Sequence, residues 1–173
     1  MTIEREISFE WVNGQRFIDL RKPLEQALRA AFTRCEFEDL SLGVEHVIWE
    51  CLEAPPERPH DKVMHLLAFG RSAQDEAEIV AGVFDIPTCN SAGEAKTNSG
   101  WFFSVPWLRP ELRRPVVDQV WQLAFCQMRR AGYTIFSTTI GTKKGKKYLS
   151  EVHGLKSSGQ KDDRGQDIWH KRI

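Results

Sequence analysis

The sequence has 173 residues, of which 41% are apolar and 28% are charged, and these values fit one folded domain and exclude a disordered chain. Its 24 Lys and Arg residues equal its 24 Asp and Glu residues, which excludes a global electrostatic attraction to nucleic acids or anionic membranes. We expect a single domain over residues 1–173, with no membrane or nucleic-acid partner.

Two helices are predicted after a short first strand. Residues 7–12 alternate between apolar and polar side chains, and a turn signal follows them. Residues 22–34 carry apolar side chains at helical spacing. Residues 37–52 predict a second helix that is interrupted near Gly43.

A hairpin and a further strand are predicted in the middle of the chain. The prolines of residues 54–60 exclude regular structure there. Apolar runs at 62–70 and 78–87 are separated by a polar turn, which indicates an antiparallel hairpin. Residues 88–99 are small and polar and predict an exposed loop, whereas the aromatic run at 100–106 predicts a strand.

The last third of the chain alternates between helices and strands. The clearest helix spans about residues 114–131, where apolar residues recur on one face. Residues 133–140 are β-branched and aromatic, as in a buried strand, and residues 143–153 predict a short helix. Two strands complete the chain. We expect the strand at 133–140 to lie parallel to the strand at 100–106 in one sheet.

These elements predict a mixed α/β (α+β) fold. Its central, mostly antiparallel sheet should have roughly six or seven strands and be flanked by about four helices. The order is strand, two helices, three antiparallel strands, helix, strand, helix and two strands.

Two segments resemble motifs of the GCN5-related N-acetyltransferase family. The stretch 108–118 is similar to the family's pyrophosphate loop, whose pattern is approximately V-x-P-x-x-R-G-x-G-x-G, and Pro110 and Arg113 match it. Farther on, YLSEVHGLK resembles the family's YEKLGF segment, with Gly154-Leu155 in place of Gly-Phe. The resemblance covers about residues 62–173 and implies an acyl-CoA N-acyltransferase-like fold in a divergent member.

The resemblance implies acetyl-CoA as the cosubstrate. In the family a strand leads to a helix N-terminus, where free N–H groups and the helix dipole bind the pyrophosphate. The candidate cofactor-binding residues at the matching positions, with a lysine of the next helix, are Val105, Arg109, Arg113, Arg114, Pro115, Val116, Val117 and Lys143.

Three positions depart from the family's pattern. Arg114, Val116 and Asp118 stand where the family has glycines. The Val116 side chain obstructs a close approach of the backbone, Pro115 lacks an N–H donor, and Asp118 adds negative charge. Arginine side chains can compensate by pairing with phosphates, so we expect weak or altered CoA binding.

Tyr148 and Ser150 are the candidate catalytic residues. The resemblance implies a general acid for the leaving thiolate in the YEKLGF-like segment, where Ser150 occupies the tyrosine position and Tyr148 lies two residues earlier. A half-buried packing role is the alternative for Tyr148. Asp85, Glu78 and His65 are among the residues that remain open as the base, each with a simpler role as a surface or hydrogen-bonded group.

The cysteines and the N-terminal residues indicate a cytoplasmic protein. The four cysteines are far apart and form no CxxC pair, so we interpret them as reduced thiols. The first residues lack the apolar segment of a signal peptide, and no apolar run has the length of a membrane span. The histidines show no metal-ligand spacing with the cysteines, and no metal is expected.

Two functions remain open from the sequence. The first is an acetyl-CoA-dependent N-acetyltransferase that acts on a primary amine of a small molecule or protein. The second is a non-catalytic binding or assembly module on the same fold, of phage or mobile-element origin, that has lost the CoA site. A protein partner or a homodimer fits the second function.

Overall fold

The computed structural model describes most of the chain, namely residues 7–33, 35, 43–53, 63–71, 76–87 and 102–173. The segments 37–42, 54–60 and 88–99, for which the sequence analysis makes predictions, are outside the described residues.

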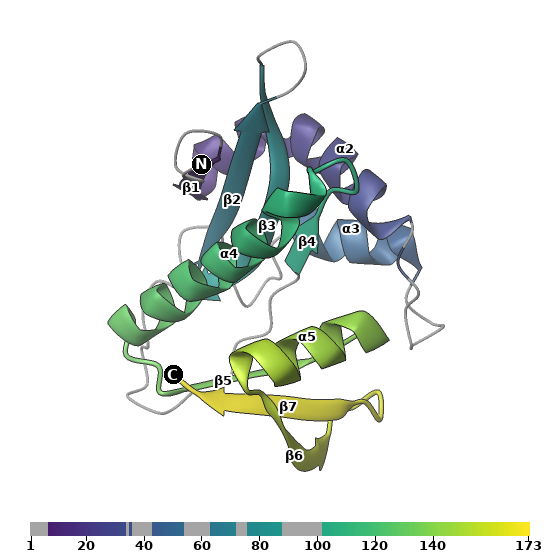
Figure 1. Cartoon of the computed structure of the whole chain (residues 1–173), viewed down its shortest axis with the longest axis vertical. Coiled ribbons are helices and arrows are strands. Elements are labelled where there is room, and N and C mark those ends of the chain that lie inside the picture. Colours follow the sequence, from purple (N-terminus) through teal and green to yellow (C-terminus); the bar gives the residue numbers. More distant parts are fainter. Residues whose placement is uncertain (1–6, 34, 36–42, 54–62, 72–75, 88–101) are drawn as a thin grey trace.

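The described elements follow the predicted order along the chain (Figure 1). A short helix that was not predicted, α1, begins at the turn signal after the first strand. The elements are β1 (Ser8–Val12), α1 (Gly14–Asp19), α2 (Arg21–Phe32), α3 (Val44–Leu52), β2 (Val63–Arg71), β3 (Ala77–Pro87), β4 (Phe102–Ser104), α4 (Pro110–Arg130), β5 (Ile135–Thr139), α5 (Lys143–His153), β6 (Lys156–Lys161) and β7 (Asp167–Arg172).

The strands form two antiparallel sheets. The first has the order β1-β2-β3-β4 and the second the order β5-β7-β6. The mixed α/β class is confirmed, but the expected pairing of β4 with β5 in one sheet is wrong. The β4 strand pairs with β3 over three residues, and the Val105 N–H then donates to the Val80 carbonyl at 2.8 Å before the chain turns away. A pocket separates β4 from β5.

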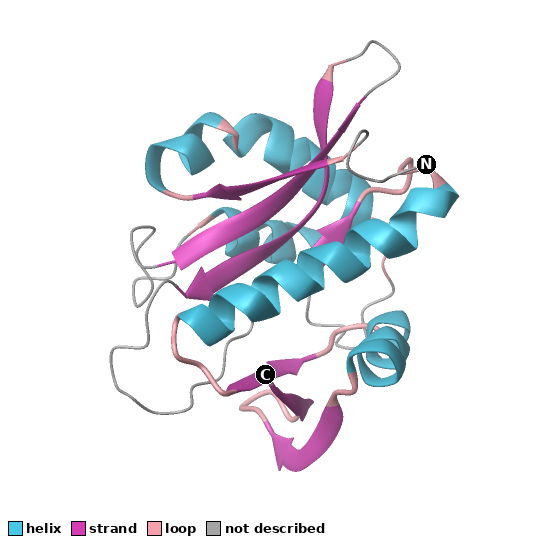
Figure 2. Cartoon of the chain, turned by 60° about the vertical axis from the view of Figure 1, so that its left-hand side comes forward, coloured by secondary structure: helices cyan, strands magenta, loops and turns pink. Residues whose placement is uncertain are grey.

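Helices cover both faces of the first sheet. Helix α4 lies across one face, and α2 and α3 lie on the other (Figure 2). The apolar side chains of α4 recur at helical spacing, and this stripe faces the core. Its buried members are Val116, Val120, Trp121, Ala124, Phe125 and Met128.

Helix α4 begins at Pro110, before the expected start at Arg114. Proline is well suited to the first turn of a helix, and the negative charge of Glu111 is favourable near the positive, N-terminal end of the helix dipole. The N–H groups of Leu112 and Arg113 already donate to the Arg109 carbonyl, at 2.9 and 3.2 Å. The segment expected as a phosphate-binding loop is therefore part of the helix.

Helix α5 ends and begins at well-defined caps. The Thr142 hydroxyl accepts a hydrogen bond from the Gly145 N–H at 3.0 Å. Gly154 adopts the left-handed conformation, with φ of 68°, and thereby ends the helix as its sequence position predicts. The helix lies beside the three-stranded sheet in the lower part of Figure 1.

Gly82 allows the closest approach between β2, β3 and β4. A Cβ atom there would lie 2.8 Å from the Leu66 carbonyl oxygen and 2.8 Å from a ring carbon of Phe103. We expect Gly82→Ala to lower the free energy of unfolding by about 1–3 kcal/mol, because the backbone must shift. The control is Gly43→Ala, where an added Cβ meets no atom within 4 Å. Urea denaturation measures both; equal losses would contradict this prediction.

Candidate functional site

A pocket of about 500 Å³ lies between the two sheets. It is bounded by the edge strands β4 and β5, by the first half of α4 and by the start of α5. Its lining residues are Ala31, Phe32, Cys35, Phe102, Phe103, Ser104, Arg113, Arg114, Val117, Trp121, Thr138, Thr139, Ile140, Gly141, Thr142, Lys144, Gly145, Tyr148 and Leu149.

The expected pyrophosphate cradle is absent from the segment 110–118. Inside a helix, N–H groups donate to carbonyls four residues earlier, so those of residues 116–118 are directed along α4. Val116 is fully buried in the core, where its side chain faces away from a ligand. Val117, the next residue, does line the pocket. A diphosphate would therefore have to bind through side chains.

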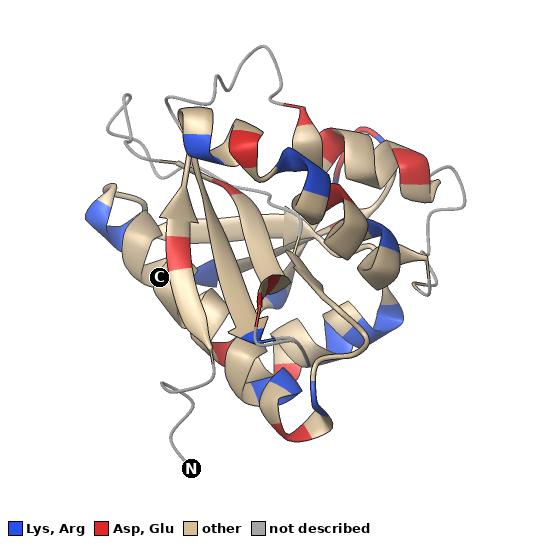
Figure 3. Cartoon of the chain, turned by 90° about the horizontal axis from the view of Figure 1, so that it is seen from above, with Lys and Arg blue, Asp and Glu red and all other residues tan. Residues whose placement is uncertain are grey.

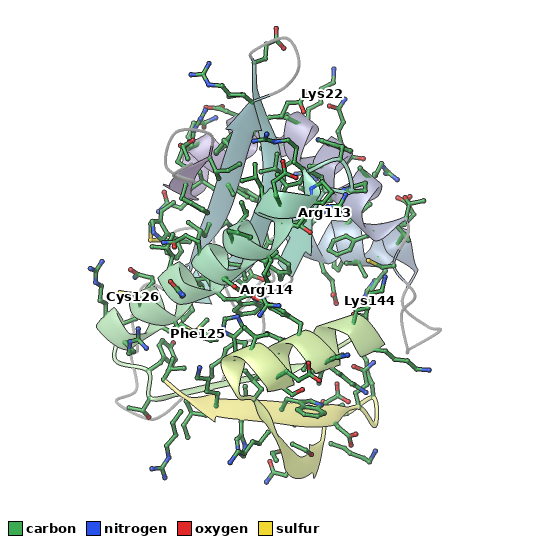
Figure 4. The ribbon with its side chains drawn as sticks, in the orientation of Figure 1. Lys22, Arg113, Arg114, Phe125, Cys126 and Lys144 are labelled. Carbon is green, nitrogen blue, oxygen red and sulfur yellow. The ribbon has the colours of Figure 1, made fainter. Side chains whose placement is uncertain are left out.

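Two of the three candidate arginines line the pocket, and both have internal partners. The Arg113 guanidinium donates to the carbonyls of Leu108 at 2.7 Å and Pro106 at 2.5 Å, which holds the turn before α4. Arg114 donates from Nε to both carboxylate oxygens of Asp118 at 2.9 Å. Figure 4 shows Arg114 between the ribbons of α4 and α5. Neither guanidinium is locked in the core, since both residues are exposed.

The remaining candidate binding residues do not line the pocket. Arg109 is exposed and lies 3.4 Å from Glu111. Val105 is buried and uses its N–H within the first sheet. Pro115 is inside α4 and does not line the pocket, and neither does Lys143. Lys144, its neighbour, lines the pocket instead.

Tyr148 is at the centre of a hydrogen-bonded cluster at the pocket wall. Its hydroxyl donates to Oδ1 of Asp118 at 2.7 Å and lies 2.8 Å from Nε2 of His153. The Arg114 guanidinium lies over the Tyr148 ring, 4.9 Å from the ring centre. We name Asp118, Tyr148 and His153 the tyrosine cluster.

Burial and charge shift both titratable partners of this cluster. Burial, followed by the hydrogen bond to Asp118, raises the pKa of Tyr148 well above its usual range. Tyr148 therefore keeps its proton at neutral pH. Burial, followed by the charge of Lys171, lowers the pKa of His153, whereas Asp118 opposes this shift. His153 is therefore largely neutral near pH 7.

Ser150 lies apart from the cluster. Its hydroxyl donates to the Lys147 carbonyl of the same helix at 3.2 Å, and the residue does not line the pocket. Two positions separate it from Tyr148, which places the two side chains on different faces of α5.

Several pocket residues had no signal in the sequence. The end of β5 and the following turn contribute Thr138 and Thr139, and α2 is followed by Cys35. Burial raises the pKa of the Cys35 thiol, while the nearby Lys144 opposes the shift. These residues meet only because the two sheets face each other, and spacing along the chain does not reveal this.

The charges of the molecule are mixed. Figure 3 shows basic and acidic positions side by side on the ribbon seen from above, in agreement with the zero net charge. Among the described residues, no group of three or more His, Cys, Asp or Glu side chains could hold a metal ion. No described helix is both long and apolar enough to cross a bilayer.

Comparison with solved structures identifies the architecture as that of the GCN5-related N-acetyltransferases. The similarity lies in the fold, whereas the sequences have diverged. An acetyltransferase from Streptococcus agalactiae superimposes with a TM-score of 0.62 and 13% identity, covering 98% of this chain and 99% of that chain. A GCN5-related N-acetyltransferase from Kribbella flavida gives 0.57 and 13%, covering 98% and 99%. The expected resemblance is confirmed at this level.

A third structure contains the expected cosubstrate. The structure of yncA from Salmonella typhimurium, solved with its cofactor acetyl-CoA, gives a TM-score of 0.54 and 9% identity, covering 96% of this chain and 93% of that chain. The sequence itself matches no protein-family model and no curated protein.

The lowered pKa of His153 makes stability depend on pH. In the unfolded chain a histidine binds its proton near pH 6.5, above the lowered pKa of the folded state. The stabilisation is therefore complete above about pH 6.5 and is lost as the pH falls toward the lower, folded pKa. We expect the urea midpoint to drop more between pH 7.5 and 5.5 in the wild type than in His153→Gln. An equal drop in both proteins would contradict this.

Proposed function

We propose that the protein is an N-acetyltransferase that moves an acetyl group from acetyl-CoA to a primary amine. The observation that carries this proposal is the pocket between β4 and β5, with the Tyr148 hydroxyl cluster in its wall. The named activity of the structures with the same fold supports it, as does the acetyl-CoA in one of them.

The edge strands suit an extended thioester donor. In the described part of the chain, β4 and β5 are each the last strand of their sheet. Edge strands carry backbone N–H and C=O groups that can pair with amides. The pantetheine arm of CoA contains two such amides. We propose that these strands hold the arm and present its thioester near Tyr148.

The phosphates of CoA would meet side chains instead of a glycine-rich loop. Arg113, Arg114 and Lys144 line the pocket, and the first two already have partners on the protein. A charge-assisted contact contributes about 1.5–3 kcal/mol, so one or two of them offset part of the missing backbone cradle. We therefore propose weaker binding of acetyl-CoA than a glycine-rich loop would give.

Labelled acetyl-CoA tests this function directly. The full chain is incubated with acetyl-CoA that carries the label in its acetyl group and with a panel of primary amines, and labelled amide is measured. We expect transfer to at least one class of amine. A thermal shift in acetyl-CoA shows binding, since a ligand at 100 times its Kd adds about 2.7 kcal/mol of stability, and a shift without transfer to any amine would contradict the transferase. No shift and no transfer would contradict it as well and would favour the non-catalytic module that has lost the CoA site.

A further inference from the structure

The tyrosine cluster has a defined arrangement of protons. A phenol hydroxyl has one proton to donate and two positions that accept. A carboxylate only accepts, so the Tyr148 proton points to Asp118 across the 2.7 Å contact. The His153 Nε2 atom, 2.8 Å away, must then be the donor to the Tyr148 oxygen. One accepting position of this oxygen is left for a ligand.

Asp118 and His153 lie behind Tyr148 as seen from the pocket. Tyr148 lines the pocket, and the other two residues of the cluster do not. Arg114 holds the Asp118 carboxylate through both of its oxygens. The His153 ring is buried, and its centre lies 6.1 Å from that of Trp121. The positions of both partners are therefore set by contacts outside the pocket.

We propose that Tyr148 accepts a proton from the bound amine and passes its own proton to Asp118, with His153 holding the phenol in place. This inference rests on the proposed function. It goes beyond the role that the family resemblance implies, in which this residue donates a proton to the thiolate, because Tyr148 here first accepts the proton of the amine while its own proton moves to Asp118. Asp118 and His153 are positioning residues in this scheme, and Tyr148 is the residue that contacts the substrate.

The proton transfers balance over one turnover. The amine nitrogen attacks the thioester carbon, and its excess proton moves to the Tyr148 oxygen as the Tyr148 proton moves to Asp118. The carbon–sulfur bond then breaks, and the sulfur takes a proton from Tyr148 while Asp118 returns the stored one. The products are the amide and the free thiol, and the cluster regains its starting protonation.

The surroundings of Tyr148 favour a relay over an ionised phenol. The charged groups that face the cluster are Arg114 and Asp118 from α4 and Lys171 from β7. Burial and Asp118 raise the pKa of Tyr148, and Arg114 opposes them. A phenolate is therefore disfavoured, and the oxygen can accept a proton only as it gives one up.

The Asp118→Asn variant tests the relay. An asparagine oxygen still accepts the hydrogen bond of Tyr148 but does not store its proton. We expect kcat to fall by at least about 10²-fold, with KM changed by less than about threefold. The matched control is Glu111→Gln, an exposed change on the same helix that should leave the rate unchanged. A smaller loss in Asp118→Asn would overturn the relay.

Nitrogen NMR of the histidine ring tests the proton arrangement without any turnover. In the wild type at pH 7.5, we expect the His153 proton on Nε2. A proton on Nδ1 alone would overturn the proposal, because Nε2 would then accept the Tyr148 proton that Asp118 is said to receive. If the chain transfers no acetyl group to any amine, the proposed function fails, and this measurement still decides the proton arrangement.

Discussion

The Tyr148→Phe variant is expected to lose about 10²- to 10⁴-fold of the acetyl-transfer rate while it keeps its fold. The phenylalanine ring fills the same space, but the hydroxyl that contacts Asp118 and His153 is gone. The loss should be in kcat, because the hydroxyl acts on protons during the reaction. Steady-state kinetics with saturating donor and a thermal melt measure the two effects.

The other tyrosine of the chain provides the control. Tyr133 is buried and does not line the pocket. We expect the Tyr133→Phe variant to retain its transfer rate, whatever its effect on the melting temperature. A Tyr148→Phe variant as active as the wild type would exclude the hydroxyl from the chemistry.

Replacing Trp121 with alanine is expected to cost about 3–5 kcal/mol of the free energy of unfolding. The Trp121 ring is 3% exposed and packs against Phe102 of β4 and Phe136 of β5, with ring centres 5.8 and 5.5 Å away. Trp121 on α4 therefore connects the two sheets, because its ring contacts an edge strand of each. Its loss leaves a cavity that opens into the pocket, and urea denaturation followed by circular dichroism measures the cost.

An exposed tryptophan shows whether the loss comes from packing. Trp49 on α3 is 60% exposed, and Trp49→Ala should change the free energy of unfolding by about 0.5 kcal/mol or less. Similar losses in the two variants would show that Trp121 does not have the structural role described above.

Hydrophobic periodicity predicted most of the elements because their burial follows from local patterns. The expected strands at 62–70 and 78–87 are β2 and β3, and the helix at 143–153 is α5. The start of α4 was misplaced because Pro115 resembles a first-turn proline, whereas Pro110 has that position. No local sequence pattern predicts the division into two sheets, because that division depends on the distance in space between β4 and β5.

The candidate site, like the fold, could be predicted only in part from the sequence. Tyr148 was a candidate from its position in the motif-like segment, and it is the residue that joins the cluster. Asp118 was interpreted as an obstacle to phosphate, and its pairing with Arg114 is visible as a four-residue spacing. Its contact with Tyr148 depends on how α5 packs near α4, which spacing along the chain does not determine.

The division between the sheets also determines where a bound ligand would be detected. In the described residues no backbone ladder joins β4 to β5, so the two sheets can separate without breaking a strand hydrogen bond. A ligand that pairs with both edges would act as an added strand and connect two cooperative units. Amide hydrogen exchange should then slow mainly in β4 and β5, while the amides shared by β2 and β3 keep their rates.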